Sequence, residues 1–129
     1  MDASALLKRY VEEEESEAAA TILADGPWAS GAHLYPEVRI ALARRLAASE
    51  LAIAVARFER DWQAVQVIAL DASLPRRAAH LGIGHRLRTL DALHLAAAER
   101  AGGAELTFVT FDERLAVAAR AMRWPVAGV

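Results

Sequence analysis

The sequence contains no cysteine. Disulfide bonds and thiolate metal sites are therefore excluded, and the absence agrees with a protein of the reducing cytoplasm. Long hydrophobic runs are also missing, since no apolar stretch approaches the ~20 residues that span a bilayer. The N-terminus lacks the charged and then apolar segments of a signal peptide. We therefore expect a cytoplasmic protein with no membrane segment.

An excess of positive charge is absent as well. The chain has 15 Lys and Arg against 17 Asp and Glu, a formal net charge of −2. The protein as a whole does not attract polyanions, so any nucleic acid must be held by a local basic patch or through bound cations. The length of 129 residues, 55% of them hydrophobic, suits a single domain over residues 1–129.

Hydrophobic periodicity predicts helices that alternate with strands along most of the chain. The expected helices cover about 4–15, 16–24, 35–48, 49–63, 72–81, 89–102 and 112–122. The expected strands cover about 28–32, 65–70, 106–110 and 124–127, and a loop is expected at 82–88. This alternation predicts an α/β fold with parallel strands and helices on both faces of one sheet. Ligands of such folds bind at the carboxyl ends of the strands.

Four acidic residues stand where predicted helices begin. Asp2 directly precedes the first helix, and Asp112 follows the strand at 106–110. Glu37 and Asp91 lie in first helical turns, and Thr89 is placed to cap the helix of Asp91. Each acid by itself can be a simple cap or a partner of the helix dipole. Together they predict a cluster of carboxylates at one edge of the sheet.

Carboxylates that share a crevice raise each other's pKa unless a cation lies among them. Oxygen ligands without cysteine favour Mg²⁺ or Mn²⁺, which keep several waters. Such ions can activate water and stabilise charge on a phosphodiester. Ser4 and Thr110 are near enough in sequence to orient the acids by hydrogen bonds, although both can equally be ordinary caps.

Four segments of the chain carry a resemblance to a known family. They are DASALLK at 2–8, PEVR and ALAR at 36–39 and 41–44, LDALHLA at 90–96, and FVTFDERL at 108–115. In this order and spacing they resemble the PIN-domain ribonucleases, and within them the VapC-type toxins of bacterial toxin–antitoxin pairs. The resemblance covers nearly the whole chain.

The resemblance implies a three-layer α/β/α fold with a parallel sheet. It also implies an Mg²⁺- or Mn²⁺-dependent endoribonuclease, the toxin of a type II toxin–antitoxin system, that cleaves RNA phosphodiesters with metal-activated water. A homodimer and a cognate antitoxin that occludes the site are the implied partners. The residues that match the family's catalytic and metal-binding acids are Asp2, Glu37, Asp91 and Asp112, with Ser4 and Thr110 at its supporting hydroxyl positions.

The chain departs from the family at its start. The family has several apolar residues before the first aspartate, which form a central strand, whereas only Met1 precedes Asp2 here. We therefore expect a truncated first strand, and either an upstream start or the lack of that strand explains it. A second hypothesis follows: a catalytically impaired PIN-fold module that retains antitoxin or partner binding. A phosphoacceptor receiver domain is a weaker third, because it does not require the segments of Glu37 and Asp112.

Two further features remain open between function and structure. His94 lies three residues after Asp91 and can join a metal site, but such a histidine more often packs at a core edge. The densest basic stretch can bind the RNA backbone or form a solvated face. Its members are Arg76, Arg77, His80, His85, Arg86 and Arg88.

The helices expected at 35–63 carry apolar residues on more than one side. These residues are Leu42, Leu46, Leu51, Ile53, Val55, Phe58 and Trp62. Helices of this kind predict a homodimer and an additional apolar groove that takes a segment of the antitoxin.

Overall fold

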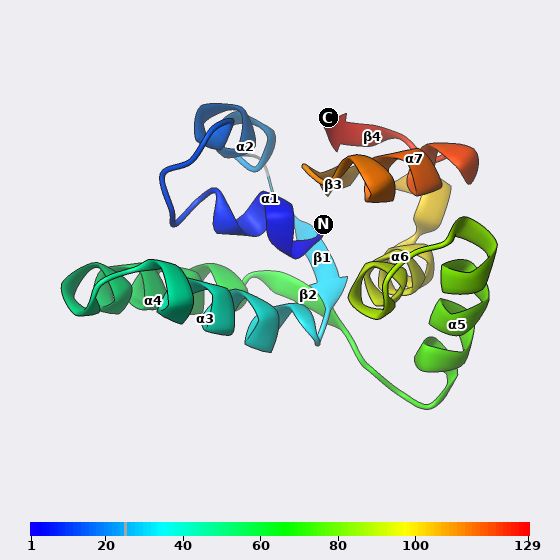
Figure 1. The fold of residues 1–129 in the computed structure, drawn as a ribbon, viewed down its shortest axis with the longest axis horizontal. Coiled ribbons are helices and arrows are strands. Elements are labelled where there is room, and N and C mark those ends of the chain that lie inside the picture. The colour runs from blue at the N-terminus through cyan, green and yellow to red at the C-terminus, as the bar shows by residue number, and fades with distance from the viewer. Residues whose placement is uncertain (25) are drawn as a thin grey trace.

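The structure, a computed structural model, describes residues 1–24 and 26–129. Its helices are α1 (Ala3–Leu7), α2 (Ser16–Ile22), α3 (Leu34–Arg45), α4 (Ala48–Trp62), α5 (Ser73–His85), α6 (Thr89–Ala101) and α7 (Glu113–Ala121), with a 3-10 turn at Gly103–Glu105. Its strands are β1 (Trp28–Gly31), β2 (Val65–Ile68), β3 (Phe108–Thr110) and β4 (Val126–Gly128). The type and order of the expected helices and strands are therefore confirmed (Figure 1).

The strands are parallel, as expected, but the prediction of one continuous sheet is wrong. In the described residues, β1 pairs only with β2 and β3 pairs only with β4. Residues Met1 and Asp2 lie between the two pairs, because the Met1 amine donates to the Ala29 carbonyl at 3.1 Å and the Asp2 amide donates to the Val109 carbonyl at 3.3 Å. Two residues are too few to form a strand of their own. The two strand pairs are thus joined here by single backbone hydrogen bonds of Met1 and Asp2 rather than by a further paired strand.

A cavity of about 390 Å³ adjoins this split. Met1, Trp28 and Val109 are among the residues that line it. The Trp28 indole nitrogen is buried there and has no hydrogen-bond partner in the part of the chain that the structure describes. Buried polar groups are normally paired, so this donor marks a place where the two halves of the sheet are incompletely packed.

The first helix is shorter than expected: the prediction of 4–15 is wrong beyond Leu7. Lys8 turns back toward the acidic run, where its ammonium pairs with the Glu15 carboxylate at 2.8 Å and donates to the Glu14 carbonyl at 2.7 Å. Glu15 has a left-handed backbone with φ of 63°. Consecutive glutamates near a helix C-terminus oppose its dipole and repel one another. The run therefore forms an exposed turn, as predicted for it.

Helix α5 is longer than expected, because it continues to His85 and only then gives way to a loop. The loop predicted at 82–88 is therefore wrong at its first four positions. A Cβ placed on Gly82 would lie 3.2 Å from the Ala92 side chain, so the glycine permits close packing of α5 on α6. Arg86 ends the helix in a left-handed conformation with φ of 55°. Packing against α6 thus outweighs the weak helix propensity of glycine.

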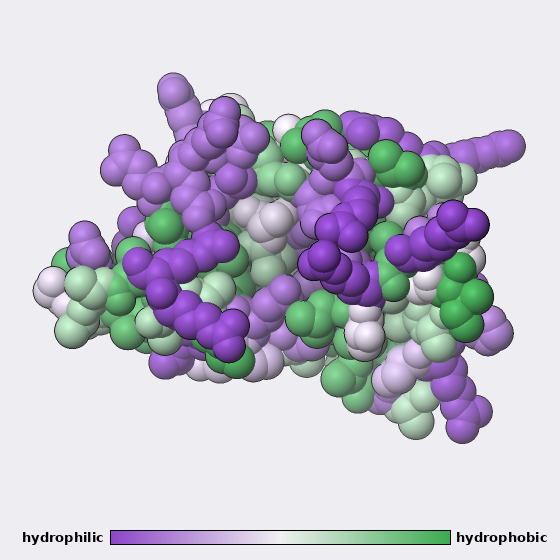
Figure 2. Space-filling model, viewed as in Figure 1, coloured by the Kyte–Doolittle hydropathy of each residue, from purple (hydrophilic) through white to green (hydrophobic). Residues whose placement is uncertain are grey.

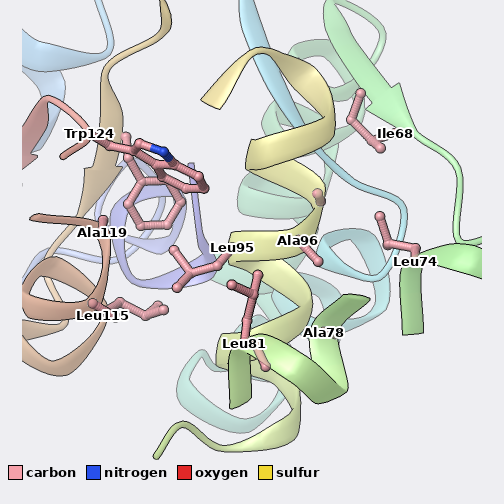
Figure 3. Close-up of a cluster of buried hydrophobic side chains, with 13 residues drawn as sticks. Ile68, Leu74, Ala78, Leu81, Leu95, Ala96, Leu115, Ala119 and Trp124 are labelled. Carbon is pink, nitrogen blue, oxygen red and sulfur yellow. The ribbon is translucent and has the colours of Figure 1, made fainter. Parts of the chain in front are cut away.

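Two clusters of buried side chains lie on the two sides of the strands. Helices α1, α3 and α4 share one cluster, in which Phe58 and Leu42 are fully buried. Helices α5, α6 and α7 share the other, where Leu81 and Leu115 approach Leu95 of α6 from neighbouring helices (Figure 3). Helices on either side of central strands form the three-layer α/β/α arrangement that was predicted.

Helix α4 is amphipathic and illustrates how the helices meet the solvent. Its Phe58 and Ala54 face the core, whereas Ile53 is largely exposed. The helix has 15 residues, and several of them carry charged side chains. Among the described residues, no helix has the length and apolar character needed to cross a membrane.

Candidate active site

Asp2 is the most enclosed of the four predicted acids. It caps α1, and its side chain is 2% exposed. Its carboxylate accepts hydrogen bonds from the Ser4 hydroxyl at 2.8 and 2.9 Å, the Ala5 amide at 3.2 Å and the Thr110 hydroxyl at 2.8 Å. Hydrogen bonds to an ionised acceptor are among the strongest in proteins. Asp2 therefore ties α1 to the end of β3 and has little capacity left for a ligand.

The two hydroxyls extend this link to the start of α7. Thr110 is fully buried, and its hydroxyl accepts from the Asp112 amide at 3.0 Å while it donates to Asp2. The Ser4 hydroxyl accepts from the Phe111 amide at 2.8 Å. The Asp2 and Asp112 segments, 110 residues apart in sequence, are thereby held in a fixed relation. Ser4 and Thr110 make hydrogen bonds of the kind expected of them, and their supporting role in a site stays a prediction.

Asp112 is the N-cap residue of α7. Its Oδ1 accepts from the Arg114 amide at 2.8 Å and from the Leu115 amide at 3.1 Å. Both bonds use the same oxygen, so Oδ2 stays available to a ligand. The side chain is half-buried at the edge of the sheet. Asp112 can therefore act as a cap and as a ligand at the same time.

Asp91 lies in the first turn of α6 with few partners of its own. Burial raises the pKa of its carboxyl, and the nearby Asp112 carboxylate raises it further, against the weaker influences of His94 and Arg88. Thr89 does not cap the helix, because Arg88 occupies the cap position and no side chain bonds there. That part of the prediction is wrong. A cation beside Asp91 and Asp112 would remove the repulsion between them.

Glu37 lies in the first turn of α3 and is partly buried. Its Oε2 is 2.8 Å from Nε2 of His94, which is 3% exposed on α6. His94 therefore packs in the interior, in line with the structural alternative given for it above. Its ring also contacts one of the four acids. This hydrogen bond joins α3 to the helix that carries Asp91.

The donor set suits Mg²⁺ or Mn²⁺ in its chemistry, since the candidate ligands are carboxylate oxygens. Among the described residues, no group of three or more acids or histidines is drawn together closely enough to enclose an ion. Mg²⁺ is commonly held by one or two carboxylates and keeps several waters. Asp91 and Asp112 are half-buried, and their like negative charges repel each other. The pair therefore fits an ion held in this way.

Two residues near these elements were not singled out from the sequence. Asp71 follows β2 and opens α5, the same pattern as the four acids, but Arg100 and Ser73 bind its carboxylate. The Ser73 hydroxyl and then the Arg100 guanidinium hold the pKa of Asp71 well below its usual range. His33 lies behind His94, with their ring nitrogens 3.1 Å apart. No local pattern signals the contact of Asp71 with Arg100 or that of His33 with His94, since these partners are distant in sequence.

Part of the basic stretch is engaged by other side chains of the protein. Arg77 forms two bonds of 2.6 Å to the Glu99 carboxylate, which engage its guanidinium. Arg76, Arg86 and Arg88 have exposed side chains on α5 and on the loop before α6. These three are better placed than Arg77 to meet an anionic ligand.

Comparisons with known proteins agree with the fold. The model of the PIN domain family matches residues 1–121. Two curated relatives, ribonuclease VapC45 and ribonuclease VapC49 of Mycobacterium tuberculosis, are each 38% identical over 126 residues, covering 93% of this chain and 88% of theirs. The crystal structure of M. tuberculosis VapC20, titled a sarcin–ricin loop cleaving toxin, superposes with a TM-score of 0.70 at 20% identity, covering 91% of this chain and 92% of that one. The chain belongs to the PIN-domain family, and within it to the VapC ribonucleases.

Proposed function

We propose that this protein is an Mg²⁺- or Mn²⁺-dependent endoribonuclease and the toxin of a type II toxin–antitoxin pair. The observation that carries the proposal is the pair of Asp91 and Asp112, two carboxylates at helix openings on one edge of the fold. The raised pKa of Asp91 supports a nearby cation. The ribonuclease names of the curated relatives support RNA as the substrate.

Each acid has a distinct part in this proposal. Asp91 and Asp112 hold the ion, and Glu37, which is not drawn together with them in the described structure, would join them from α3 when the ion is bound. Asp2 organises the site through Ser4 and Thr110, which place the Asp112 segment. When bound, the ion supplies the activation of water and the neutralisation of charge that phosphodiester hydrolysis needs.

The RNA backbone requires positive charge that the chain as a whole does not provide, since its net charge is −2. Arg86 and Arg88 have exposed side chains and can contact phosphates near the start of α6. Arg76 is also exposed, but it lies beside Arg77, which bonds to Glu99 near the end of α6. Arg77 is a weaker candidate, because its bond to Glu99 would have to break.

The proposed protein partners are a second copy of the chain and a cognate antitoxin. Figure 2 shows hydrophilic side chains over most of one face, with hydrophobic surface over α5 at its right-hand edge. Ile40, Ile53 and Ile83 are among the exposed large apolar side chains. Exposed apolar side chains support association with a partner. Light scattering tests the dimer at tens of micromolar, an order suited to ~μM affinities, and a strict monomer contradicts it.

Cleavage of a mixed RNA substrate tests the proposed activity. We expect the wild-type protein to cut with Mn²⁺ present and to stop when EDTA is added. Cleavage that resists EDTA contradicts the metal mechanism. A protein that binds Mn²⁺ and cuts no RNA instead supports the catalytically impaired module.

A further inference from the structure

A pair of buried histidines stands behind Glu37 in the candidate site. His94 is 3% exposed, and its Nε2 lies 2.8 Å from Oε2 of Glu37. His33 is 8% exposed at the start of α3, and its Nε2 lies 3.1 Å from Nδ1 of His94. The planes of the two rings are tilted by 48°, and the ring centroids are 4.4 Å apart. Three side chains from two helices therefore form one hydrogen-bonded row.

The row allows one arrangement of protons when both rings are neutral. An ionised carboxylate only accepts, so Nε2 of His94 must donate to Glu37. Nδ1 of His94 is then an acceptor, and the proton between the rings belongs to Nε2 of His33. This leaves Nδ1 of His33 without a proton. In the described structure that same atom is buried and has no hydrogen-bond partner.

The surroundings keep His33 neutral and fixed in place. Burial and, second, the neighbouring His94 lower the pKa of His33 to about 4, against the opposing influence of Glu37. Gly31 leaves room for the ring, because a Cβ at that position would collide with His33. The His33 ring thus packs directly against the backbone at the end of β1. An unpaired buried acceptor carries a desolvation penalty, so its presence calls for a compensating role.

We propose that His94, oriented by His33, is a positioning residue that holds the Glu37 carboxylate for ion binding. His94 binds Oε2 only, so Oε1 is left for a ligand, and the Glu37 side chain is 27% exposed. Partners of this kind fix the rotamer of a metal ligand, and their loss weakens metal binding about 10- to 100-fold. This inference rests on the proposed function, because it assigns Glu37 to an ion.

Two variants of His94 separate positioning from packing. His94→Gln keeps an N–H near the position of Nε2, whereas the shorter side chain of His94→Asn reaches only the position of Nδ1. We expect Mn²⁺ affinity, measured by calorimetry, to fall about tenfold in His94→Asn. His94→Gln should bind Mn²⁺ within about threefold of the wild type, since the bond to Glu37 survives. The exposed His80 on α5 provides a control, and His80→Asn should leave the affinity unchanged.

The outcomes distinguish this inference from the proposed function. Equal Mn²⁺ affinity in His94→Asn and the wild type contradicts positioning and leaves the proposed function intact. A wild-type protein that binds no Mn²⁺ contradicts the proposed function itself. If His94→Asn does not fold, nitrogen NMR of the wild type decides, and the expected result is a proton on Nε2 of His94, hydrogen-bonded to Glu37. An Nε2 of His94 that carries no proton overturns the proposal.

Discussion

Asp2 and Asp91 occupy corresponding places at helix openings, yet their surroundings are opposite. The Asp2 carboxylate is almost wholly buried and accepts bonds from two hydroxyls and one amide. Asp91 is half-buried, and its pKa is raised by burial and by the Asp112 carboxylate. The protein satisfies the Asp2 carboxylate, whereas His94 and Arg88 do not offset the effect of burial and of Asp112 on Asp91. The difference supports the proposal that Asp2 organises the site and that Asp91 binds the ion.

Asp71 extends the comparison to an acid outside the predicted set. It also opens a helix after a strand, but its pKa is lowered by Ser73 and by Arg100 of α6. A carboxylate already paired with a guanidinium offers little to a cation. The environment of the acid, rather than its place in the sequence, therefore separates ligand from cap.

The largest expected effect comes from removing the charge of Asp91. Asp91→Asn keeps the size of the side chain, and RNA cleavage should slow by about 10²- to 10³-fold, the effect of losing an electrostatic contact to the transition state. Stability should change by less than ~1 kcal/mol, because lost dipole stabilisation is offset by relief from Asp112. Initial rates and melting temperatures measure both effects. Asp71→Asn is the matched control and should cleave normally; a wild-type rate in Asp91→Asn removes the distinction between these acids.

Asp2→Asn should produce the reverse pattern, a large loss of stability. The substitution removes the charged acceptor of the Ser4 and Thr110 hydroxyls, and hydrogen bonds to charged groups contribute about 1.5–3 kcal/mol. We expect the free energy of unfolding in urea to fall by about 2 kcal/mol. An unchanged midpoint of urea unfolding would show that the hydrogen bonds of Asp2 do not stabilise the fold as proposed.

The pH dependence of stability tests the interior on the Glu37 side of the site. The pKa of His33 is about 4 in the folded protein against 6.5 for the free side chain. The unfolded chain therefore binds more protons between these values, so stability is full above pH 6.5 and falls as the pH drops toward 4. We expect His33 to account for roughly 2 kcal/mol of this loss, after allowance for solvent screening. His33→Gln cannot titrate, so its stability should decline less over the same window; parallel curves contradict the prediction.

Much of this architecture could be predicted from the sequence because its signals are local. Periodic apolar residues gave the order of helices and strands, and the acids at helix openings pointed to Asp2 and Asp112 as caps, which the structure bears out. The end of α1 was missed because Lys8 pairs with Glu15 further along the chain, a contact that apolar periodicity does not signal. The continuation of α5 through Gly82 depends on packing against Ala92.

The environments of the acids could not be predicted in the same way. Thr110 was expected to orient the acids, but it donates to Asp2 because α1 meets β3, and the cation that satisfies Asp71 comes from Arg100. Both partners are far away along the chain. His33 carries no pattern of its own, and only the meeting of α3 with α6 brings its ring to His94. Sequence spacing thus identified candidate acids but not which of them lack partners.

The smallest expected effect concerns the split between the two halves of the sheet. An engineered extension of about five apolar β-branched residues before Met1 should pair with β1 and β3 and fill the adjoining cavity. We expect a gain of about 1 kcal/mol, or a few degrees in melting temperature, which would further fix the segment of Asp2. An extension of the same length made of Gly and Ser is the control. Equal melting temperatures for the two extensions contradict the prediction that an added strand pairs with β1 and β3.

The central claim is that the ion is bound by Asp91 and Asp112, where carboxylate charge is unbalanced, and that Asp71 is only a cap. Calorimetric titration with Mn²⁺ tests it directly on the wild type, Asp91→Asn and Asp71→Asn, each confirmed as folded. The account predicts saturable binding by the wild type and by Asp71→Asn, and an affinity at least about tenfold weaker in Asp91→Asn. Equal affinity in all three proteins, or no binding by the wild type, would contradict it.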